Sequence, residues 1–344
     1  MTKLPQEFQH HKHNILTQKA AHITISNFFT ESGAYYPNLK LSYQLVGSDN
    51  VNAPIVLVNH ALTGNSEVTG ENGWWNKLIG EDKCIDTNHF KILSFDIPGN
   101  GFFMEGGLIE HYKDFVARDV AKIFLRGLEQ LKINQLFAAI GGSLGGGIAW
   151  EMAVLEPNLI QNLIPIAADW KSTDWLMGNC FLQERILENS SNPVEDARIH
   201  AMLCYRTPFS LKVKFQRTRH KEKDMFNTES WLAHHGKKLQ QRYQLGAYKL
   251  MNQLLKTIDI TRGRGPLETV ASKIAGNIHI ISINSDIFFS PDEDIETYRR
   301  LKRFKENIYH DEIQSIHGHD AFLIEYGQLS QMLRNIFQVQ KSSI

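Results

Sequence analysis

The chain has 344 residues, 42% hydrophobic and 22% charged, so it can bury the core of one large α/β domain or of a domain with an insertion. Lys plus Arg equal Asp plus Glu at 37 each, which leaves no net charge to attract nucleic acid or an anionic membrane and favours a small-molecule partner. Cys84, Cys180 and Cys204 have no metal or redox spacing. They predict reduced thiols in a cytoplasmic protein.

Residues 1–20 are polar and include His10, His11 and His13, without the apolar segment of a signal peptide. They are expected to form a flexible arm rather than a metal site. Residues 136–155 are apolar enough to resemble a membrane span, but they contain Glu151 and five glycines. This segment is therefore expected to be a buried strand followed by a helix.

Short apolar runs rich in β-branched residues recur along the chain and end at turn residues. Because most are continuous rather than alternating, they predict strands that are covered on both faces, as in a parallel sheet. The predicted strands are 41–46, 55–59, 90–95, 136–140, 163–167, 278–284 and 311–316.

Helical periodicity is clearest at residues 112–131, which predict a crossover helix of this sheet. From residue 170 to 275 the pattern becomes charged, aromatic and helical, without a convincing parallel strand. The sequence thus predicts an α/β catalytic domain at 21–169 and 276–344, interrupted by a helical cap at 170–275. Within the cap, the apolar positions of 231–255 suit packing against the body or another subunit.

A serine surrounded by glycines follows the predicted strand 136–140. In Gly141-Gly142-Ser143-Leu144-Gly145, the G-x-S-x-G spacing is typical of a sharp strand-to-helix turn that exposes a nucleophile. The adjoining helix N-terminus would direct backbone donors at the same point.

A serine nucleophile needs a base and an orienting acid, and both have candidates downstream. Asp286 follows the strand 278–284 and His319 follows the last strand, which is the chain order of the α/β-hydrolase fold. His317 is an alternative base, and Asp292 or Glu293 an alternative acid. His319 is favoured because the helical run after it would fix its ring.

The oxyanion of such a reaction needs two backbone donors. One is expected from Leu144, directly after the nucleophile, and the other from Leu62 in the loop after the strand 55–59.

These residues resemble the homoserine O-acetyltransferases, a branch of the α/β hydrolases, from about residue 41 to 326. The most specific motifs are Gly73-Trp74-Trp75 and Gly318-His319-Asp320-Ala321-Phe322. Others are His60-Ala61-Leu62-Thr63-Gly64, the serine motif, Tyr205-Arg206-Thr207, and Ser230-Trp231-Leu232 with His235-Gly236-Lys237-Lys238-Leu239.

The resemblance implies a fold, the α/β-hydrolase fold with an inserted helical lid, and an activity, acetyl transfer from acetyl-CoA to L-homoserine by a ping-pong route in methionine biosynthesis. It implies that Arg198 and Tyr205 hold the acceptor carboxylate and that Asp320 faces its amino group. Acetyl-CoA would be a co-substrate, with no permanently bound cofactor and no metal. A homodimer joined through cap helices is also expected.

The chain departs from the family at two points near the expected substrate entrance. Residues 97–103 replace the usual Gly-Ser-Thr-Gly-Pro segment, and residues 189–193 shorten the region of the usual Asp-Pro-x-Trp stretch. A succinyl donor, a serine acceptor or an esterase reaction therefore remain alternatives. A binding module on an inactive hydrolase scaffold is the alternative outside enzymology.

Overall fold

The computed structural model describes residues 21–102 and 107–338, so the predicted arm at 1–20 lies outside the described residues. Within them, an eight-stranded sheet has the order β1-β2-β6-β3-β7-β8-β9-β10. β2 pairs antiparallel with β1 and β6, and the other neighbours are parallel. The strands are β1 (Ala21–Phe29), β2 (Tyr35–Gly47), β3 (Ile55–Asn59), β6 (Lys91–Phe95), β7 (Leu136–Gly142), β8 (Ile160–Ile166), β9 (Asn277–Ile283) and β10 (Ile308–Ile313), with β4 (Ile79–Gly80) and β5 (Ile85–Asp86) as a separate pair.

The mostly parallel sheet predicted from the sequence is confirmed, although several strand bounds differ: β2 begins at Tyr35 rather than at residue 41, and β8 at Ile160 rather than at residue 163. β10 begins at Ile308 rather than at residue 311, because its parallel register with β9 runs from Ile308 to Ile313 and buries both isoleucines. β1 was not predicted, although Ile23 and Ile25 are buried between exposed neighbours. That alternation is the signal of an edge strand with one covered face.

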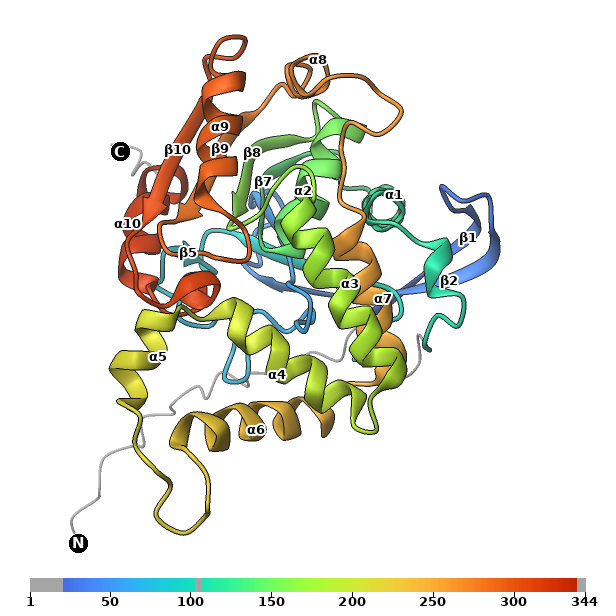
Figure 1. The fold of residues 1–344 in the computed structure, drawn as a ribbon. Helices are drawn as coiled ribbons and strands as arrows, with labels where there is room; N and C mark the ends of the chain where they lie inside the picture. The colour runs from blue at the N-terminus through green and yellow to red at the C-terminus, as the bar shows by residue number, and fades with distance from the viewer. Residues whose placement is uncertain (1–20, 103–106, 339–344) are drawn as a thin grey trace, which may run out of the picture.

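Helices cover both faces of the sheet (Figure 1). Side chains of α1 (Ala117–Gln130), α2 (Leu144–Leu155), α8 (Leu267–Ala271) and α9 (Pro291–Leu301) belong to the apolar cluster on one face, and those of α10 (Tyr326–Phe337) to the cluster on the other. Successive strand residues enter opposite clusters, as Val56 and Leu57 do. The continuous apolar strands of the sequence are explained by this double coverage.

The predicted helix at 112–131 is divided into a 3-10 turn, η2 (Tyr112–Asp114), and α1. The division arises because the Asp119 carboxylate accepts hydrogen bonds from the amides of Val116, at 2.9 Å, and Glu31, at 2.7 Å. These bonds fix an extended residue before α1 and so begin the helix at Ala117.

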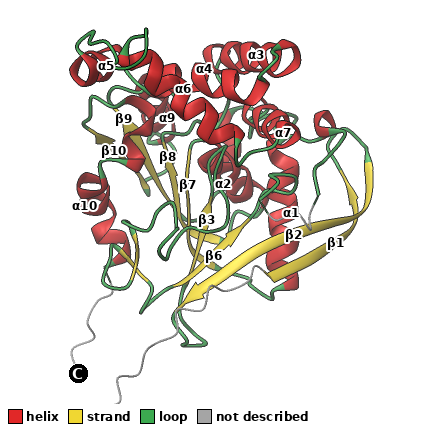
Figure 2. Ribbon diagram, turned by 90° about the horizontal axis from the view of Figure 1, so that it is seen from below, coloured by secondary structure: helices red, strands yellow, loops and turns green. Residues whose placement is uncertain are grey.

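Five longer helices follow β8 and form most of the cap: α3 (Asp174–Asn189), α4 (Pro193–Tyr205), α5 (Pro208–Phe215), α6 (Asn227–Gln240) and α7 (Leu245–Lys256). Thr173 and Thr207 cap α3 and α5 through their hydroxyl groups, and prolines begin α4 and α5. Figure 2 shows α3 to α6 together at one end of the strands. This is the end at which Ser143, Asp286 and His319 leave the sheet.

The apolar positions of residues 231–255 pack within the subunit. They are all buried against the body and the rest of the cap: Leu239, Tyr243, Tyr248, Met251, Leu254 and Leu255. The sequence left open whether they meet the body or another subunit, and the structure places them against the body. The apolar side chains that the cap exposes lie elsewhere, on α3, α4 and α5.

The described residues contain no helix that is long and apolar enough to cross a membrane. In the same part of the chain, no group of three or more His, Cys, Asp or Glu side chains is arranged to hold a metal ion. Burial raises the pKa of Cys180 to about 12 and that of Cys204 to about 11. Both thiols are therefore protonated near neutral pH and are poor nucleophiles.

Candidate active site

Ser143 occupies the sharp turn between β7 and α2, with φ 55° and ψ −127°. A Cβ at Gly145 would lie 2.3 Å from the carbonyl oxygen of Asn59, and one at Gly141 would lie 2.5 Å from the backbone of Gly145. Only glycine permits these approaches, so the serine motif is explained by backbone packing. The turn places Ser143 at the N-terminus of α2, where it is 4% exposed.

His319 and Asp286 form a buried pair beside this turn. The Nδ1 atom of His319 lies 2.6 Å from Oδ2 of Asp286, while Oδ1 of Asp286 accepts hydrogen bonds from the amides of Phe288 and Phe289. These bonds orient the carboxylate, which in turn fixes Nδ1 as the donor and leaves Nε2 for proton transfer. The arrangement is that of a general base and its orienting acid.

Phe322 connects the serine turn with the base. Its ring would be 2.6 Å from a Cβ at Gly142, and it lies edge-on to the His319 ring with the centroids 5.6 Å apart. Phe289 stacks on His319 at 5.1 Å. Aromatic contacts on several sides therefore hold the imidazole beside the nucleophile turn.

The alternative base, His317, has different partners. Its Nδ1 atom accepts hydrogen bonds from the Ser210 hydroxyl at 3.0 Å and from Arg206 Nη1 at 3.3 Å. Neither partner is an acid that could orient a general base. Asp286, rather than Asp292 or Glu293, pairs with His319.

Leu62, in the loop after β3, and Leu144, the first residue of α2, are the expected oxyanion donors, and the segments that carry them contact each other. Asn59 Nδ2 donates to the carbonyl of Gly145 at 3.3 Å. Among the described residues, the backbone hydrogen bonds of turns, loops and helix ends include none donated by the amide of Leu62 or by that of Leu144. Both amides therefore remain available to a ligand. The carbonyl of Leu62 accepts a bond from the Tyr243 hydroxyl at 2.8 Å, which ties this loop to the cap.

A buried polar network that sequence reasoning missed supports the Leu62 loop. His60 donates from Nδ1 to the carbonyl of Ala61 at 2.8 Å and accepts at Nε2 from the amide of Ile97 at 3.0 Å. Burial lowers the pKa of His60, which agrees with the neutral ring that these two bonds require.

Asp96 completes this network beside residues 97–103, where the sequence departs from the family that it resembles. Its carboxylate accepts bonds from the amide and hydroxyl of Ser66, from the Ser42 hydroxyl and from Asn100 Nδ2. The replaced segment at 97–103 thus supplies Asn100 as a partner for Asp96, and together they hold the end of the Leu62 loop. Only the fold, which brings these distant residues together, reveals this role.

Arg198 and Tyr205, the expected carboxylate-binding residues, lie together above the base. The Arg198 guanidinium is 5.5 Å from the centre of the Tyr205 ring, whose centroid is 5.4 Å from that of His319. Burial raises the pKa of Tyr205 well above its usual value, so the hydroxyl remains a donor. Arg198 therefore lies beside a ring that contacts the candidate base.

Asp320, expected to face the acceptor's amino group, already has a cationic neighbour. Arg206 Nε lies 3.0 Å from Asp320 Oδ2, but this Nε atom makes no hydrogen bond to any described residue. The ion pair is thus close but poorly aligned. Arg206 was noted in the sequence only as part of a motif, and its contact with Asp320 depends on the position of the cap.

A buried pair of acidic residues lies near Asp286. Asp169, after β8, and Asp294, on α9, are 4% and 3% exposed, and neither carboxylate oxygen of Asp169 has a partner among the described residues. Burial and the nearby negative charges, including Asp286, raise the pKa of both groups well above the ordinary range. Sequence reasoning missed this pair.

Comparison with known proteins identifies the family. Residues 54–185 match the family model of the alpha/beta hydrolase fold. The chain is 31% identical over 329 residues to a homoserine O-acetyltransferase of Cyclobacterium marinum, with 89% of this chain and 92% of that protein covered. It belongs to the homoserine O-acetyltransferase family. A family member from Trichormus variabilis is 30% identical, with 90% of this chain and 91% of its own covered.

Solved structures confirm the α/β-hydrolase fold of this family member. A homoserine O-acetyltransferase from Bacillus anthracis superposes with a TM-score of 0.82 at 19% identity, with 95% of this chain and 99% of that chain covered. Esterase E22 gives the same TM-score at 17% identity, with 93% and 100% covered. Since a transferase and an esterase fit equally well, the shape of the fold alone does not choose between the two reactions.

Proposed function

We propose that this chain transfers an acetyl group from acetyl-CoA to the side-chain hydroxyl of L-homoserine through an acetyl-enzyme on Ser143. Family membership supports the substrates. The reaction type is supported chiefly by the 2.6 Å contact between His319 and Asp286 beside the serine turn. The product, O-acetyl-L-homoserine, would enter methionine biosynthesis, and the three free cysteines suit the cytoplasm.

In the first half-reaction, His319 Nε2 takes the proton of Ser143 Oγ as this oxygen bonds to the thioester carbon. The amides of Leu62 and Leu144 donate to the oxyanion. The carbon–sulfur bond then breaks, and His319 returns the proton to the CoA sulfur. In the second half-reaction His319 takes the proton of the acceptor hydroxyl, whose oxygen attacks the acetyl carbon, and Ser143 recovers its proton as it leaves.

Arg198 and Asp320 supply the two charges that a zwitterionic amino acid needs. A guanidinium binds a carboxylate through two parallel hydrogen bonds, and a carboxylate binds an ammonium group. Asp320 would exchange part of its contact with Arg206 for the ammonium group, which the poor alignment of that ion pair allows. No permanently bound cofactor or metal enters this scheme, and acetyl-CoA acts as a co-substrate.

The test is thiol release by the purified protein with acetyl-CoA or succinyl-CoA, with and without homoserine or serine. We expect multiple turnovers only with acetyl-CoA and homoserine together. A preference for succinyl-CoA or serine would change the substrate assignment. Turnover of the acetyl-enzyme at the same rate without an amino acid would identify an esterase. Absence of any acyl-enzyme would indicate a binding module on an inactive scaffold.

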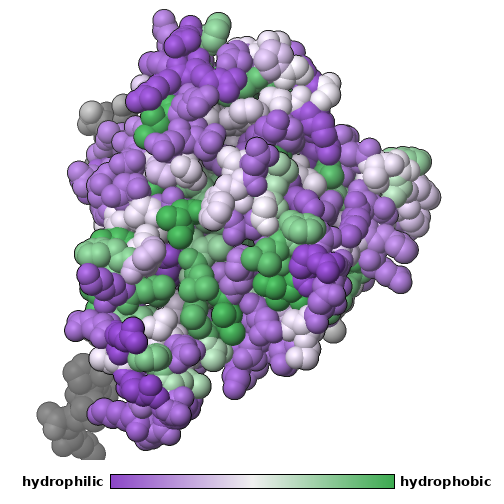
Figure 3. All heavy atoms as spheres, viewed as in Figure 1, coloured by the Kyte–Doolittle hydropathy of each residue, from purple (hydrophilic) through white to green (hydrophobic). Residues whose placement is uncertain are grey.

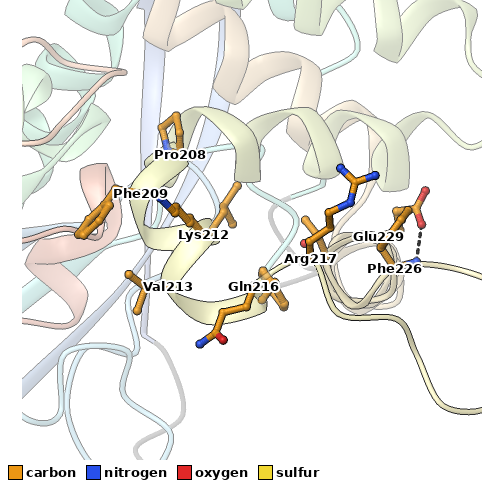
Figure 4. A pocket seen from close by; sticks show the side chains of 11 residues that line it. Pro208, Phe209, Lys212, Val213, Gln216, Arg217, Phe226 and Glu229 are labelled. Atoms are coloured by element: carbon orange, nitrogen blue, oxygen red, sulfur yellow. Dashed lines mark hydrogen bonds between the residues drawn. The ribbon is translucent and has the colours of Figure 1, made fainter.

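A homodimer joined through the cap is the second part of the proposal. Figure 3 shows apolar residues gathered over the part of the cap formed by α3 and α4, where Trp175 and Phe181 are 60% and 57% exposed. A groove of about 920 Å³ between α5 and the start of α6 adds the exposed Phe209 and Val213 (Figure 4). A second copy of the chain would cover such surfaces.

Light scattering at micromolar concentration should give the mass of two chains. Val213→Glu should shift this mass towards one chain, because it places a charge at an apolar contact. Val51→Glu is the matched control, since Val51 is 86% exposed in a loop between β2 and β3. A monomer mass for the unaltered protein would contradict the dimer.

A further inference from the structure

The segment from Arg206 to Arg242 has an unusual charge for this chain. It holds ten Lys or Arg residues and three Asp or Glu residues, although the whole chain has no net charge. This part of the cap therefore carries an excess of positive charge. A zwitterionic acceptor needs only one cation, so most of this charge is not explained by the acceptor.

Helix α5 presents two different faces. Phe209, Lys212 and Val213 line the groove on the outer face (Figure 4). Ser210 contacts His317 on the inner face, and Lys214 follows one helical turn later, so that it lies on the same side. Lys214 is exposed and, unlike Lys212, it does not line the groove.

Three basic side chains surround Trp231 on this inner side, and we call them, with Trp231, the Trp231 cluster. Lys214 Nζ is 4.9 Å and the Arg206 guanidinium 5.9 Å from the Trp231 ring, and the His235 ring is 4.5 Å from it. Among the described residues, neither Lys214 nor His235 makes an ion pair, and the acid that pairs with Arg206 is Asp320.

The positive charges of the cluster oppose one another. Burial and the Arg206 guanidinium lower the pKa of Lys214. Burial and the nearby cations, Arg198 first, lower the pKa of His235 to about 4. An anion bound among these groups would offset both the mutual repulsion and the loss of solvent.

The Trp231 cluster lies outward from the triad along a continuous set of contacts. Asp320 follows His319 in the sequence, Arg206 pairs with Asp320, and Arg206 and Lys214 both lie near the Trp231 ring. An acyl-CoA has the same order of groups, with its reacting thioester joined by a long uncharged arm to its phosphates. Its negative charges would therefore lie away from Ser143, on the side where the cations gather.

We propose that the Trp231 cluster, with Lys214 as its principal cation, binds the phosphate groups of the acyl-CoA donor. This inference rests on the proposed function, and it identifies the donor by its nucleotide part rather than by its acyl group. The alternative anion is a terminal carboxylate on the acyl group itself, as in a succinyl donor. In the first case Lys214 contacts the phosphates of the donor, and in the second it contacts the carboxylate of the acyl group.

The experiment compares acetyl-CoA with S-acetylpantetheine, which has the same thioester and arm without the phosphates. Lys214→Ala should raise the KM for acetyl-CoA about threefold to tenfold and leave kcat/KM for S-acetylpantetheine unchanged, because it removes a partly exposed charge contact. Lys214→Arg should retain most of the affinity for acetyl-CoA. Lys212→Ala, on the outer face of α5, is the matched control and should alter neither donor. Added salt should raise the KM for acetyl-CoA more in the unaltered protein than in Lys214→Ala.

Equal losses with both donors in Lys214→Ala would show a structural role and overturn the proposal. So would equal use of the two donors by the unaltered protein. If the loss appears with succinyl-CoA and S-succinylpantetheine but not with acetyl-CoA, the bound anion is the acyl carboxylate, and the proposal is again overturned. Failure of the unaltered protein to release thiol from any donor would instead contradict the proposed function itself.

Discussion

The ring of Tyr205, on the last turn of α4, lies 5.4 Å from the ring of His319. This contact joins the cap to the candidate base, and the Arg198 guanidinium lies over the same tyrosine ring, 5.5 Å from its centre. In the proposed mechanism, acceptor binding and proton transfer would therefore depend on the same few side chains. Substitutions in the cap can separate the two half-reactions.

Arg198→Ala should weaken the use of homoserine about tenfold to a hundredfold, because a charged hydrogen bond contributes roughly 1.5 to 3 kcal/mol. Acylation of Ser143 by acetyl-CoA should remain nearly unchanged. Burst kinetics without acceptor measure the first half-reaction, and the homoserine dependence of turnover measures the second. Unchanged homoserine dependence in Arg198→Ala would remove Arg198 from the acceptor site.

His319→Ala should lose several orders of magnitude in the rate of Ser143 acylation, since it removes the imidazole that pairs with Asp286. His317→Ala should retain most of the activity, because His317 contacts Ser210 and Arg206 instead of an acid. Stopped-flow thiol release compares the two variants. The opposite ranking would transfer the role of base to His317.

Ser143 should carry the acetyl group, which mass spectrometry of peptides after incubation with acetyl-CoA alone can locate. Ser143→Ala should form no adduct and have no transferase activity. An adduct on another residue, or full activity of the alanine variant, would contradict the acetyl-enzyme.

Gly145→Ala should reduce the acylation rate about a hundredfold or more while the protein remains folded. The added Cβ would lie 2.3 Å from the carbonyl oxygen of Asn59, so the start of α2 must shift and carry the Leu144 amide with it. Gly178→Ala is the matched control, because a Cβ there meets open space within α3. The control should retain activity and gain about 0.5 to 1 kcal/mol in the free energy of unfolding. Full activity in Gly145→Ala would argue against Leu144 as an oxyanion donor.

The parts of the site that follow strand ends could be predicted from the sequence. Ser143 comes directly after β7, Asp286 follows the end of β9 by three residues and His319 follows the end of β10 by six. Parallel strands bring such ends to one edge of the sheet. The contacts of Arg206 with Asp320 and His317 could not be predicted in this way. They depend on how the cap helices pack against the body, which no local sequence pattern predicts.

Buried polar groups were likewise beyond sequence reasoning. Asp96 and Asn100 resemble ordinary turn residues, yet the fold buries both next to His60. Asp169 and Asp294 are 125 positions apart by number and are brought together by the packing of α9 on the sheet. Charge pairs of this kind appear only when the tertiary contacts are known.

Asp169 should make the stability of the protein depend on pH. Burial and the neighbouring carboxylates raise its pKa in the folded state, so the folded protein holds a proton that the unfolded chain has lost. Stability is then highest below the unfolded pKa of about 3.9 and falls as the pH rises from there through the raised folded pKa. Asp294 contributes in the same direction.

Asp169→Asn removes one titrating group at nearly constant volume, so it should reduce the fall in the free energy of unfolding between pH 5 and pH 8. At pH 8 the variant should be more stable than the unaltered protein by about 1 kcal/mol or more, since each pKa unit corresponds to about 1.4 kcal/mol. Urea unfolding at the two pH values measures the difference. Asp49→Asn, at an exposed loop position, is the control and should leave the pH dependence unchanged. If Asp169→Asn and the unaltered protein lose the same stability between pH 5 and pH 8, Asp169 is ionised in the folded state and a partner must stabilise its charge.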